Sequence, residues 1–391
     1  MIKVYLKKNI APRIANGHPW IYANEVDRVA GQPEAGDIVE VHYSDGKLTG
    51  LGYINPKSQI LVRLLSRKAI PIDEKFFFNR ILDAWNYRKK LGYKENCRLI
   101  FGESDYIPAL IIDKFGDYFV IQTLSLGIDK WKPAIVDALN GIFKPKGIYE
   151  RNDVPVRSLE GLEQQKGFLS TPFDTNIVIN ENGLQFYVDI ANGQKTGYFL
   201  DQQHNRSTIK SIVKDADVMG AFTYTGTFEI HAAHYGAKSV LGIDISEQAV
   251  MQANKNAALN QLDHICKFEA MNAFDVLKEW GKQGPKYDVV MLDPPAFTKS
   301  RGNIENALTG YKEINLRGMK LIRSGGFLVT SSCTNLVSPD LFLATIEAAA
   351  KDAHKRLRQV VFQSQSPDHP IIRGIDNTNY LKFLIVEVTN N

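Results

Sequence analysis

The sequence predicts an α/β protein whose C-terminal part, residues 191–391, forms a doubly wound parallel sheet. From about residue 191, short apolar runs alternate with segments of helical periodicity, which is the pattern of repeated βα units. The composition is that of an ordinary globular protein, with 44% hydrophobic and 23% charged residues, so a disordered chain and a coiled coil are excluded. A length of 391 residues allows two or three domains, and we expect three.

The first expected domain, residues 1–70, is a small β-barrel. Gly and Pro recur at intervals of about 8 to 12 residues, as in chains of short strands. The segments of β character lie at 1–6, 31–43, 44–54 and 59–65.

The second expected domain, residues 73–190, has α+β character. It begins with a helical pattern at 76–92 that Gly92 terminates. A strand pair at 107–124, a helix near 130–143 and strands near 147–153 and 183–190 follow. The third domain, 191–391, then contributes the alternating pattern, with strands expected at 216–222, 239–245, 266–274, 286–295 and 325–334 and helices at 227–237, 247–262 and 313–322.

The charge of the chain is unevenly distributed. Lys and Arg outnumber Asp and Glu by 47 to 43, and residues 1–70 alone hold ten basic against six acidic residues. The whole excess therefore lies in the first expected domain, which favours an anionic partner there. Interleaved aromatic residues, Trp20, Tyr22, Tyr43 and Tyr53, could stack on bases, although we expect at least half of them to fill the barrel core.

Only three cysteines occur, and their spacing offers neither a disulfide framework nor a metal clip. We expect no bound metal and a reducing, cytoplasmic location. The sequence has no signal-peptide core and no apolar run long enough to span a membrane. Cys97 and Cys266 are expected to be structural residues, and Cys333 follows an expected strand.

Candidate ligand-binding residues follow the strands of the third domain, because ligands bind beyond the carboxyl ends of parallel strands. The first strand leads into the loop Phe222–Gly226, in which Gly226 would let backbone amides approach a ligand. Asp244 ends the second strand, where an acid can accept hydrogen bonds from a ribose diol.

Two further strand ends fit the same scheme. Asn272 and Ala273 follow the third strand and could receive an adenine edge. Asp293 follows the fourth strand and precedes two prolines, which fix a rigid turn at the end of a buried strand. Four polar strand ends in this order point to a nucleoside-containing ligand.

Together these motifs resemble class I S-adenosylmethionine-dependent methyltransferases, and specifically the ribosomal RNA large-subunit methyltransferase I family of 5-methylcytosine enzymes. The resemblance covers nearly the whole chain. GHPWIYANEV, GDIVEV and GLGYINPKSQILVRLL look like that family's RNA-binding PUA domain, and GQKTGYFLDQQHNR resembles the segment before its catalytic domain. AFTYTG, DPPAF and SSCT match its cofactor loop, Asp-Pro-Pro turn and cysteine motif.

The resemblance implies a Rossmann-like catalytic domain, S-adenosylmethionine as cofactor and large-subunit ribosomal RNA as partner, without a membrane and with a homodimer left open. Cys333 would be the nucleophile and Asp293 the group that contacts the base. The cofactor-binding residues would be Phe222, Tyr224, Thr225, Gly226, Asp244, Ile245, Asn272, Ala273 and Asp293. Lys195 and Arg206 could contact the RNA, with a solvated surface as the alternative.

The chain also departs from the family pattern. The family usually has Asp or Asn at Gly220, Cys at Thr223, Gly at Thr227, Asp at Asn272 and Arg at Gln203. Gly220 lacks a polar group that would orient the cofactor loop. These departures leave open a noncatalytic RNA-binding or ribosome assembly factor that has kept the fold.

Two other methyltransferases remain as alternatives. A guanine-N7 RNA enzyme would share the cofactor loop and the Asp-Pro-Pro turn, but guanine N7 has a lone pair and needs no thiol, so Cys333 argues against it. An N6-adenine enzyme normally has an aromatic residue directly after the two prolines, where this chain has Ala296.

Overall fold

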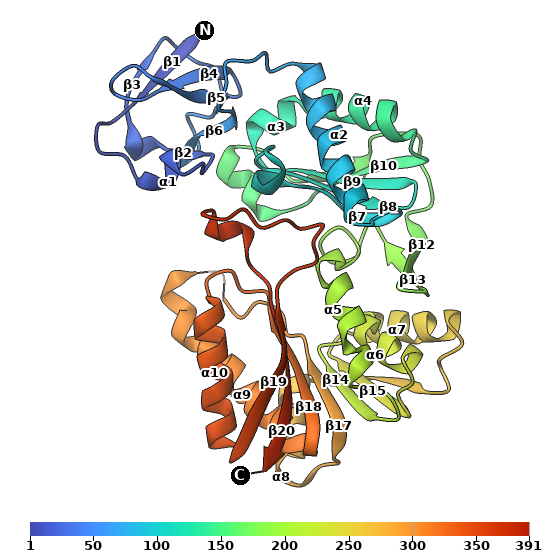
Figure 1. Ribbon diagram of the computed structural model, residues 1–391. Coiled ribbons are helices and arrows are strands. Elements are labelled where there is room, and N and C mark those ends of the chain that lie inside the picture. Colours follow the sequence, from blue (N-terminus) through green and yellow to red (C-terminus); the bar gives the residue numbers. More distant parts are fainter. Residues whose placement is uncertain (299, 391) are drawn as a thin grey trace. The chain divides into compact units, whose positions relative to one another are not determined.

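The computed structural model describes residues 1–298 and 300–390 and divides the chain into two compact units (Figure 1). Unit 1 comprises Met1–Ile179, Val188–Leu200 and Pro367–Thr378, and unit 2 comprises Asn180–Tyr187, Asp201–Ser366 and Asn379–Asn391. The sequence suggested three continuous domains, whereas here the chain passes from one unit to the other at five points.

The N-terminal part of unit 1 is a six-stranded mixed sheet of order β2-β6-β5-β4-β1-β3. Alternating side chains of its strands enclose an apolar core that includes Val4, Val41 and Val62. Its elements are β1 (Ile2–Leu6), α1 (Pro12–Ala15), β2 (Trp20–Tyr22), η1 (Ala23–Glu25), β3 (Val26–Ala30), β4 (Ile38–His42), β5 (Leu48–Ile54) and β6 (Ile60–Ser66).

The central part of unit 1 is a five-stranded sheet of order β11-β10-β9-β8-β7, which packs against two long helices. Asp73 caps the first helix by accepting a hydrogen bond from the Phe76 amide at 2.8 Å. The elements are α2 (Glu74–Lys90), β7 (Asn96–Phe101), η2 (Gly102–Asp105), β8 (Leu110–Phe115), β9 (Tyr118–Thr123), α3 (Leu126–Lys130), α4 (Lys132–Phe143), β10 (Gly147–Asn152), η3 (Pro155–Glu160) and β11 (Gln165–Phe168).

A buried polar network joins the two sheets of unit 1. Glu160, at the end of η3, accepts hydrogen bonds from Arg63 at 2.8 Å, from Ser58 at 2.5 Å and from the side-chain amide of Asn55 at 2.9 Å. All four side chains are buried, so removal of one would leave a charge or a polar atom without water. This explains why the first two expected domains form one unit.

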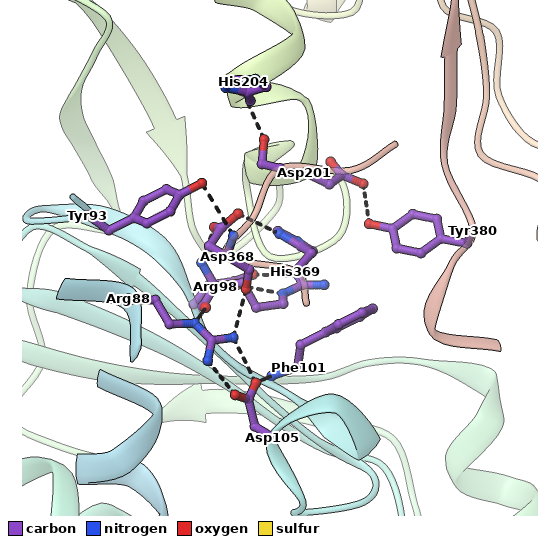
Figure 2. A network of polar contacts seen from close by, with 12 residues as sticks. Arg88, Tyr93, Arg98, Phe101, Asp105, Asp201, His204, Asp368, His369 and Tyr380 are labelled. Carbon is purple, nitrogen blue, oxygen red and sulfur yellow. Dashed lines mark hydrogen bonds and ion pairs between the residues drawn. The ribbon is translucent and has the colours of Figure 1, made fainter. Parts of the chain in front are cut away.

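The segment Pro367–Thr378, between the last two strands of the chain, also belongs to unit 1. Asp368 holds the segment there: one of its carboxylate oxygens accepts from the Arg98 amide at 2.7 Å, and its carbonyl accepts from the Arg88 guanidinium at 2.7 Å (Figure 2). Arg88 is fully buried and forms an ion pair with Asp105, and His369 lies beside Phe101. A short helix, η7 (Asp376–Thr378), ends the segment.

Unit 2 contains a seven-stranded sheet of order β16-β15-β14-β17-β18-β20-β19. The first five strands in this order are parallel, and β20 runs antiparallel to both β18 and β19. The strands are β14 (Asp217–Ala221), β15 (Ser239–Asp244), β16 (Cys266–Ala270), β17 (Tyr287–Leu292), β18 (Ile322–Ser332), β19 (Lys355–Gln363) and β20 (Lys382–Asn390).

Helices connect these strands, and an apolar core that includes Met219, Val290 and Phe342 lies between helices and sheet (Figure 1). The helices are η4 (Leu200–Gln202), α5 (Gln203–Thr208), η5 (Ile209–Ser211), α6 (Thr227–His234), α7 (Glu247–Leu259), α8 (Ala273–Gln283), η6 (Arg301–Asn303), α9 (Ile304–Leu321) and α10 (Pro339–Asp352). Within the described residues, no helix is both long and apolar enough to cross a membrane.

A hairpin of β12 (Asn176–Glu181) and β13 (Leu184–Asp189) is shared between the units, its tip belonging to unit 2. There the Gln185 amide donates to the side chain of Asn260 at 2.8 Å, and the Tyr187 amide donates to that of Asn256 at 3.0 Å. Asn256 lies in α7 and Asn260 is its C-cap, so the hairpin tip is attached to this helix.

The fold class predicted from the sequence is confirmed, but the bounds of one predicted strand and of one predicted helix need correction. The third strand ends at Ala270, and Ala273 and Phe274 begin α8, because the Asn272 side chain caps that helix. The helix expected at 313–322 begins at Ile304.

Candidate active site

The candidate site lies at the carboxyl edge of the parallel strands of unit 2. Central strand β14 pairs with β15 on one side and β17 on the other, and the strand order reverses beside it: β15 and β16 follow on one side, β17 and β18 on the other. In doubly wound sheets the crevice outside this point is where ligands bind. The predicted site residues at the ends of β14, β15, β16, β17 and β18 all belong to this edge.

The loop after β14 has an unusual backbone. Phe222, Tyr224 and Gly226 have φ values of 64°, 48° and 75°, so the loop turns tightly before α6 begins. A Cβ atom at Gly226 would lie 2.6 Å from the ring of Phe268, and glycine is therefore required by packing as well as by φ. The Thr225 carbonyl accepts from Asn256 at 3.0 Å and ties the loop to α7.

Asp244, at the end of β15, fixes the same loop. One of its carboxylate oxygens accepts from the Tyr224 amide at 2.8 Å, and the other accepts from the Ser246 amide at 3.0 Å. Each oxygen keeps a second lone pair, so the carboxylate can still accept hydrogen bonds from a diol. Ile245 beside it is 73% exposed, an apolar side chain left at the surface of the site.

Aromatic side chains lie beside the ends of β14 and β16. Phe274, in the first turn of α8, is exposed, and its ring centroid lies 5.3 Å from that of Phe222 and 5.9 Å from that of Phe297. Asn272 is exposed and its side-chain oxygen accepts from the Phe274 amide at 3.0 Å, while Ala273 is buried. These groups offer a flat apolar surface and an amide to a nucleobase.

Asp293 directly follows β17 and is held by two side chains that the sequence analysis did not single out. Gln202 donates to it at 3.1 Å, and the Ser331 hydroxyl also donates to it. Gln202 in turn accepts from Asn205 at 2.6 Å. These partners fix the carboxylate while leaving it half-buried, so it can contact a bound molecule.

Cys333 follows β18, the strand next to β17; its thiol is half-buried and forms no disulfide. Lys382 on β20 is the register partner of Ser332 and donates to the Thr334 carbonyl at 2.7 Å, so its ammonium group lies beside the cysteine backbone. Burial lowers the pKa of Lys382 to about 8, and attraction to Cys333 opposes that shift. A cation beside a thiol favours the thiolate.

Two buried polar groups near the loop have no hydrogen-bond partner among the residues that the structure describes. They are the Thr223 hydroxyl and the second carboxylate oxygen of Glu229. Burial raises the pKa of Glu229 to about 8, and repulsion from Asp293 and Asp244 acts in the same direction. Three acids around one edge fit a cationic ligand such as S-adenosylmethionine. The described residues contain no cluster of three His, Cys, Asp or Glu that could hold a metal ion.

Arg206 requires a correction. The sequence analysis offered it as an RNA contact, but its side chain is 1% exposed and forms an ion pair with Glu181, which is equally buried. The second contact of this pair measures 2.8 Å. Arg206 therefore stabilises the attachment of the hairpin tip to α5 within unit 2. Lys195 belongs to unit 1, where it is exposed and its ammonium lies 4.4 Å from the centroid of the Phe199 ring.

Part of the basic excess of residues 1–70 is also used internally. Arg63 is buried against Glu160, Arg13 donates to Glu25 at 2.6 Å, and Arg67 donates to the carbonyl of Ile14 at 2.9 Å. Among the predicted aromatic residues, Tyr53 is fully buried. The exposed cations of this part are Lys3, Lys7, Lys8, Arg28, Lys47, Lys57, Arg67 and Lys68.

Comparison with known proteins agrees with this architecture. Residues 4–67 match the model of a PUA-like domain, and residues 164–386 match that of the S-adenosylmethionine-dependent methyltransferases. The solved structure of a candidate methyltransferase from Streptococcus mutans has a TM-score of 0.83 at 20% identity and covers 99% of this chain and 100% of its own. Another candidate methyltransferase, solved with S-adenosylhomocysteine, has a TM-score of 0.85 at 20% identity and the same coverage.

Two curated relatives are similar over nearly their whole length. The ribosomal RNA large subunit methyltransferase I of Vibrio vulnificus (strain CMCP6) is 39% identical over 97% of both chains. That of Aliivibrio fischeri (strain MJ11) is 38% identical over 97% of this chain and 98% of its own. The chain belongs to the S-adenosylmethionine-dependent methyltransferases, within the ribosomal RNA large subunit methyltransferase I family.

Proposed function

We propose that this protein transfers a methyl group from S-adenosylmethionine to C5 of a cytidine in large-subunit ribosomal RNA, through a covalent bond between Cys333 and C6. The observation that carries the proposal is the position of Cys333 and Asp293 at the ends of neighbouring parallel strands, β18 and β17. The half-buried thiol and the half-buried acid can then contact one base from the same edge of the sheet.

A thiol supplies the nucleophile that methylation of cytosine C5 requires. Carbon 5 of cytosine is a poor nucleophile while the ring is aromatic. Addition of the Cys333 thiolate to C6 makes C5 an enamine carbon, which can form a bond to an electrophilic methyl group. Loss of the C5 proton to a base then restores the C5–C6 double bond and expels the thiolate. Lys382, beside the cysteine backbone, favours the ionised thiol.

Asp293 would contact the N3 and N4 edge of the base. Negative charge develops at N3 when the thiolate adds to C6, and a proton or a hydrogen bond from the acid at that edge stabilises it. Gln202 and Ser331 hold the carboxyl group in one orientation. Without these two partners, the Asp293 side chain would have to adopt this orientation during the reaction itself, which would cost conformational entropy.

S-adenosylmethionine supplies an electrophilic methyl group on a sulfonium when it is bound. Asp244 would accept hydrogen bonds from its ribose, and Asn272, Ala273 and the exposed ring of Phe274 would contact its adenine. The loop at Phe222, Tyr224, Thr225 and Gly226, together with Ile245, would close over it. This assignment follows the order of strand ends in a doubly wound sheet.

The target nucleotide has to leave its base pair, because a base inside a duplex cannot reach a half-buried thiol. The exposed cations of residues 1–70 and Lys195 are our candidates for contacts to the flanking phosphates. A ribosomal RNA substrate, as in the relatives, would place the protein in the cytoplasm.

The guanine-N7 alternative lacks a role for Cys333, and the assembly-factor alternative lacks a role for the ordered acids. The proposal is tested by mass spectrometry of ribosomal RNA from cells that lack the protein and carry either wild type or Cys333→Ala. We expect one 5-methylcytidine to vanish in the deletion and to return only with wild type. Restoration by Cys333→Ala would disprove the covalent mechanism, and a lost 7-methylguanosine would favour the alternative enzyme.

A further inference from the structure

Gly220, near the end of the central strand β14, is a glycine for an unusual reason. Its φ is not positive, so its backbone would accept any residue. A Cβ atom there would lie only 1.8 Å from a carboxylate oxygen of Glu229 and 2.9 Å from its Cγ. The side chain of Glu229, which comes from the first turn of α6, therefore fills the space that a side chain of residue 220 would take.

The Glu229 carboxyl group has a hydrogen bond to its own backbone amide, which does not explain its burial. The residue is 2% exposed, and its second carboxylate oxygen is buried without a hydrogen-bond partner among the described residues. Arg206, whose charge attracts the carboxylate form of Glu229, is already paired with Glu181. A buried acid without a partner is costly, and natural proteins retain such groups mainly where a ligand completes them.

The surroundings indicate which ligand would do so. Gly220 pairs with Gly242 on β15 and with Met291 on β17, so the carboxyl group lies above the central strand, between the strands that end in Asp244 and Asp293. Both of these acids, and Cys266 on β16, interact electrostatically with Glu229. A ligand that extends from a ribose at Asp244 toward Asp293 has to pass this point.

We propose that the Glu229 carboxylate binds the α-ammonium group of S-adenosylmethionine and so replaces a polar side chain at residue 220. An ammonium group can donate a hydrogen bond to the unpaired carboxylate oxygen, because it carries three N–H donors. The sulfonium group of the same cofactor carries a positive charge but no hydrogen-bond donor. The inference concerns the cofactor alone and does not depend on which base is methylated.

Calorimetry on the full-length protein tests this inference with two probes. S-adenosylhomocysteine carries the α-ammonium group, and 5′-methylthioadenosine lacks the whole amino-acid part. In Glu229→Gln, which keeps size and shape, we expect binding of S-adenosylhomocysteine to weaken at least about tenfold, as for loss of a charge-assisted hydrogen bond. Binding of 5′-methylthioadenosine should change less than about twofold, and the exposed control Glu347→Gln should bind both as wild type does.

A second pair of variants separates binding from folding. Glu229→Ala should lose affinity for S-adenosylhomocysteine, and Glu229→Ala combined with Gly220→Asp should recover most of it, because a carboxylate from residue 220 returns to the same place. Two results would overturn the inference: unchanged binding of S-adenosylhomocysteine by Glu229→Gln, or equal weakening of both probes in that variant. Failure of the double variant to recover affinity would likewise count against it.

Proton exchange gives a readout that a purely structural role would not move. Because burial raises the pKa of Glu229 to about 8, the carboxyl group is expected to be mostly protonated at pH 7 in the cofactor-free protein, and a bound ammonium group would ionise it. Titrations in buffers of different ionisation enthalpy should therefore show release of up to about one proton by wild type on binding S-adenosylhomocysteine. Equal release by Glu229→Gln would contradict the proposal.

Discussion

Glu229 also predicts how the stability of the cofactor-free protein depends on pH. Burial raises the pKa of this carboxyl group from 4.5 to about 8. The folded state thus prefers the protonated acid, and this contribution is fully present below about pH 4.5 and is lost as the pH rises through about 8. Between the two values each pH unit costs about 1.4 kcal/mol. From pH 6 to pH 8, wild type should lose about 2 kcal/mol relative to Glu229→Gln, whose side chain does not titrate.

Hydrogen exchange is the suitable assay, because the slowest amides of β14 report the opening of unit 2 separately from unit 1. Comparison of wild type and variant at the same pH removes the intrinsic exchange rate. Glu347→Gln, an exposed acid on α10, is the matched control and should follow wild type. If the opening free energies of wild type and Glu229→Gln differ by a constant amount from pH 6 to pH 8, the carboxyl group is not protonated in the folded state and the reasoning fails.

Three further predictions concern the ion pair and the thiol. Arg206→Met should destabilise unit 2 by about 3 to 5 kcal/mol in denaturant unfolding, because it leaves the Glu181 carboxylate buried without its arginine. Arg206→Met combined with Glu181→Leu should recover most of the lost stability. If Arg206→Met alone were as stable as wild type, the structural role of Arg206 would be wrong. Lys382→Met should slow the alkylation of Cys333 by iodoacetamide at pH 7.5 and raise the pH at which the alkylation rate is half-maximal. An unchanged pH profile would show that Lys382 does not promote ionisation of the thiol. In the presence of S-adenosylmethionine, RNA that contains 5-fluorocytidine should form a denaturation-resistant adduct with wild type, because C5 keeps its fluorine after methyl transfer and cannot lose a proton. Cys333→Ser should form none, so an adduct in the variant would exclude this cysteine as the nucleophile.

The sequence by itself determined the fold class and the strand ends that form the site. Alternating apolar runs and helical periodicity are local properties, and they predicted the strand that ends at Asp244 and the strands that Asp293 and Cys333 follow. Parallel strands present their carboxyl ends at one edge, so these residues belong to one edge once the topology is known. The end of the third strand was less well predicted. Asn272 caps a helix, and the local pattern did not distinguish the end of the strand from the start of that helix.

Only the tertiary structure decided which other side chains complete or leave the site. Gln202 and Lys382 reach it through contacts with residues far away in the sequence, and the burial of Arg206 depends on Glu181 in a hairpin that precedes the sheet. Local periodicity carries no information on such pairs, because they form only when the strand order brings the elements together. Gly220 was visible in the sequence as a missing polar group, and the structure alone showed that Glu229 occupies its space.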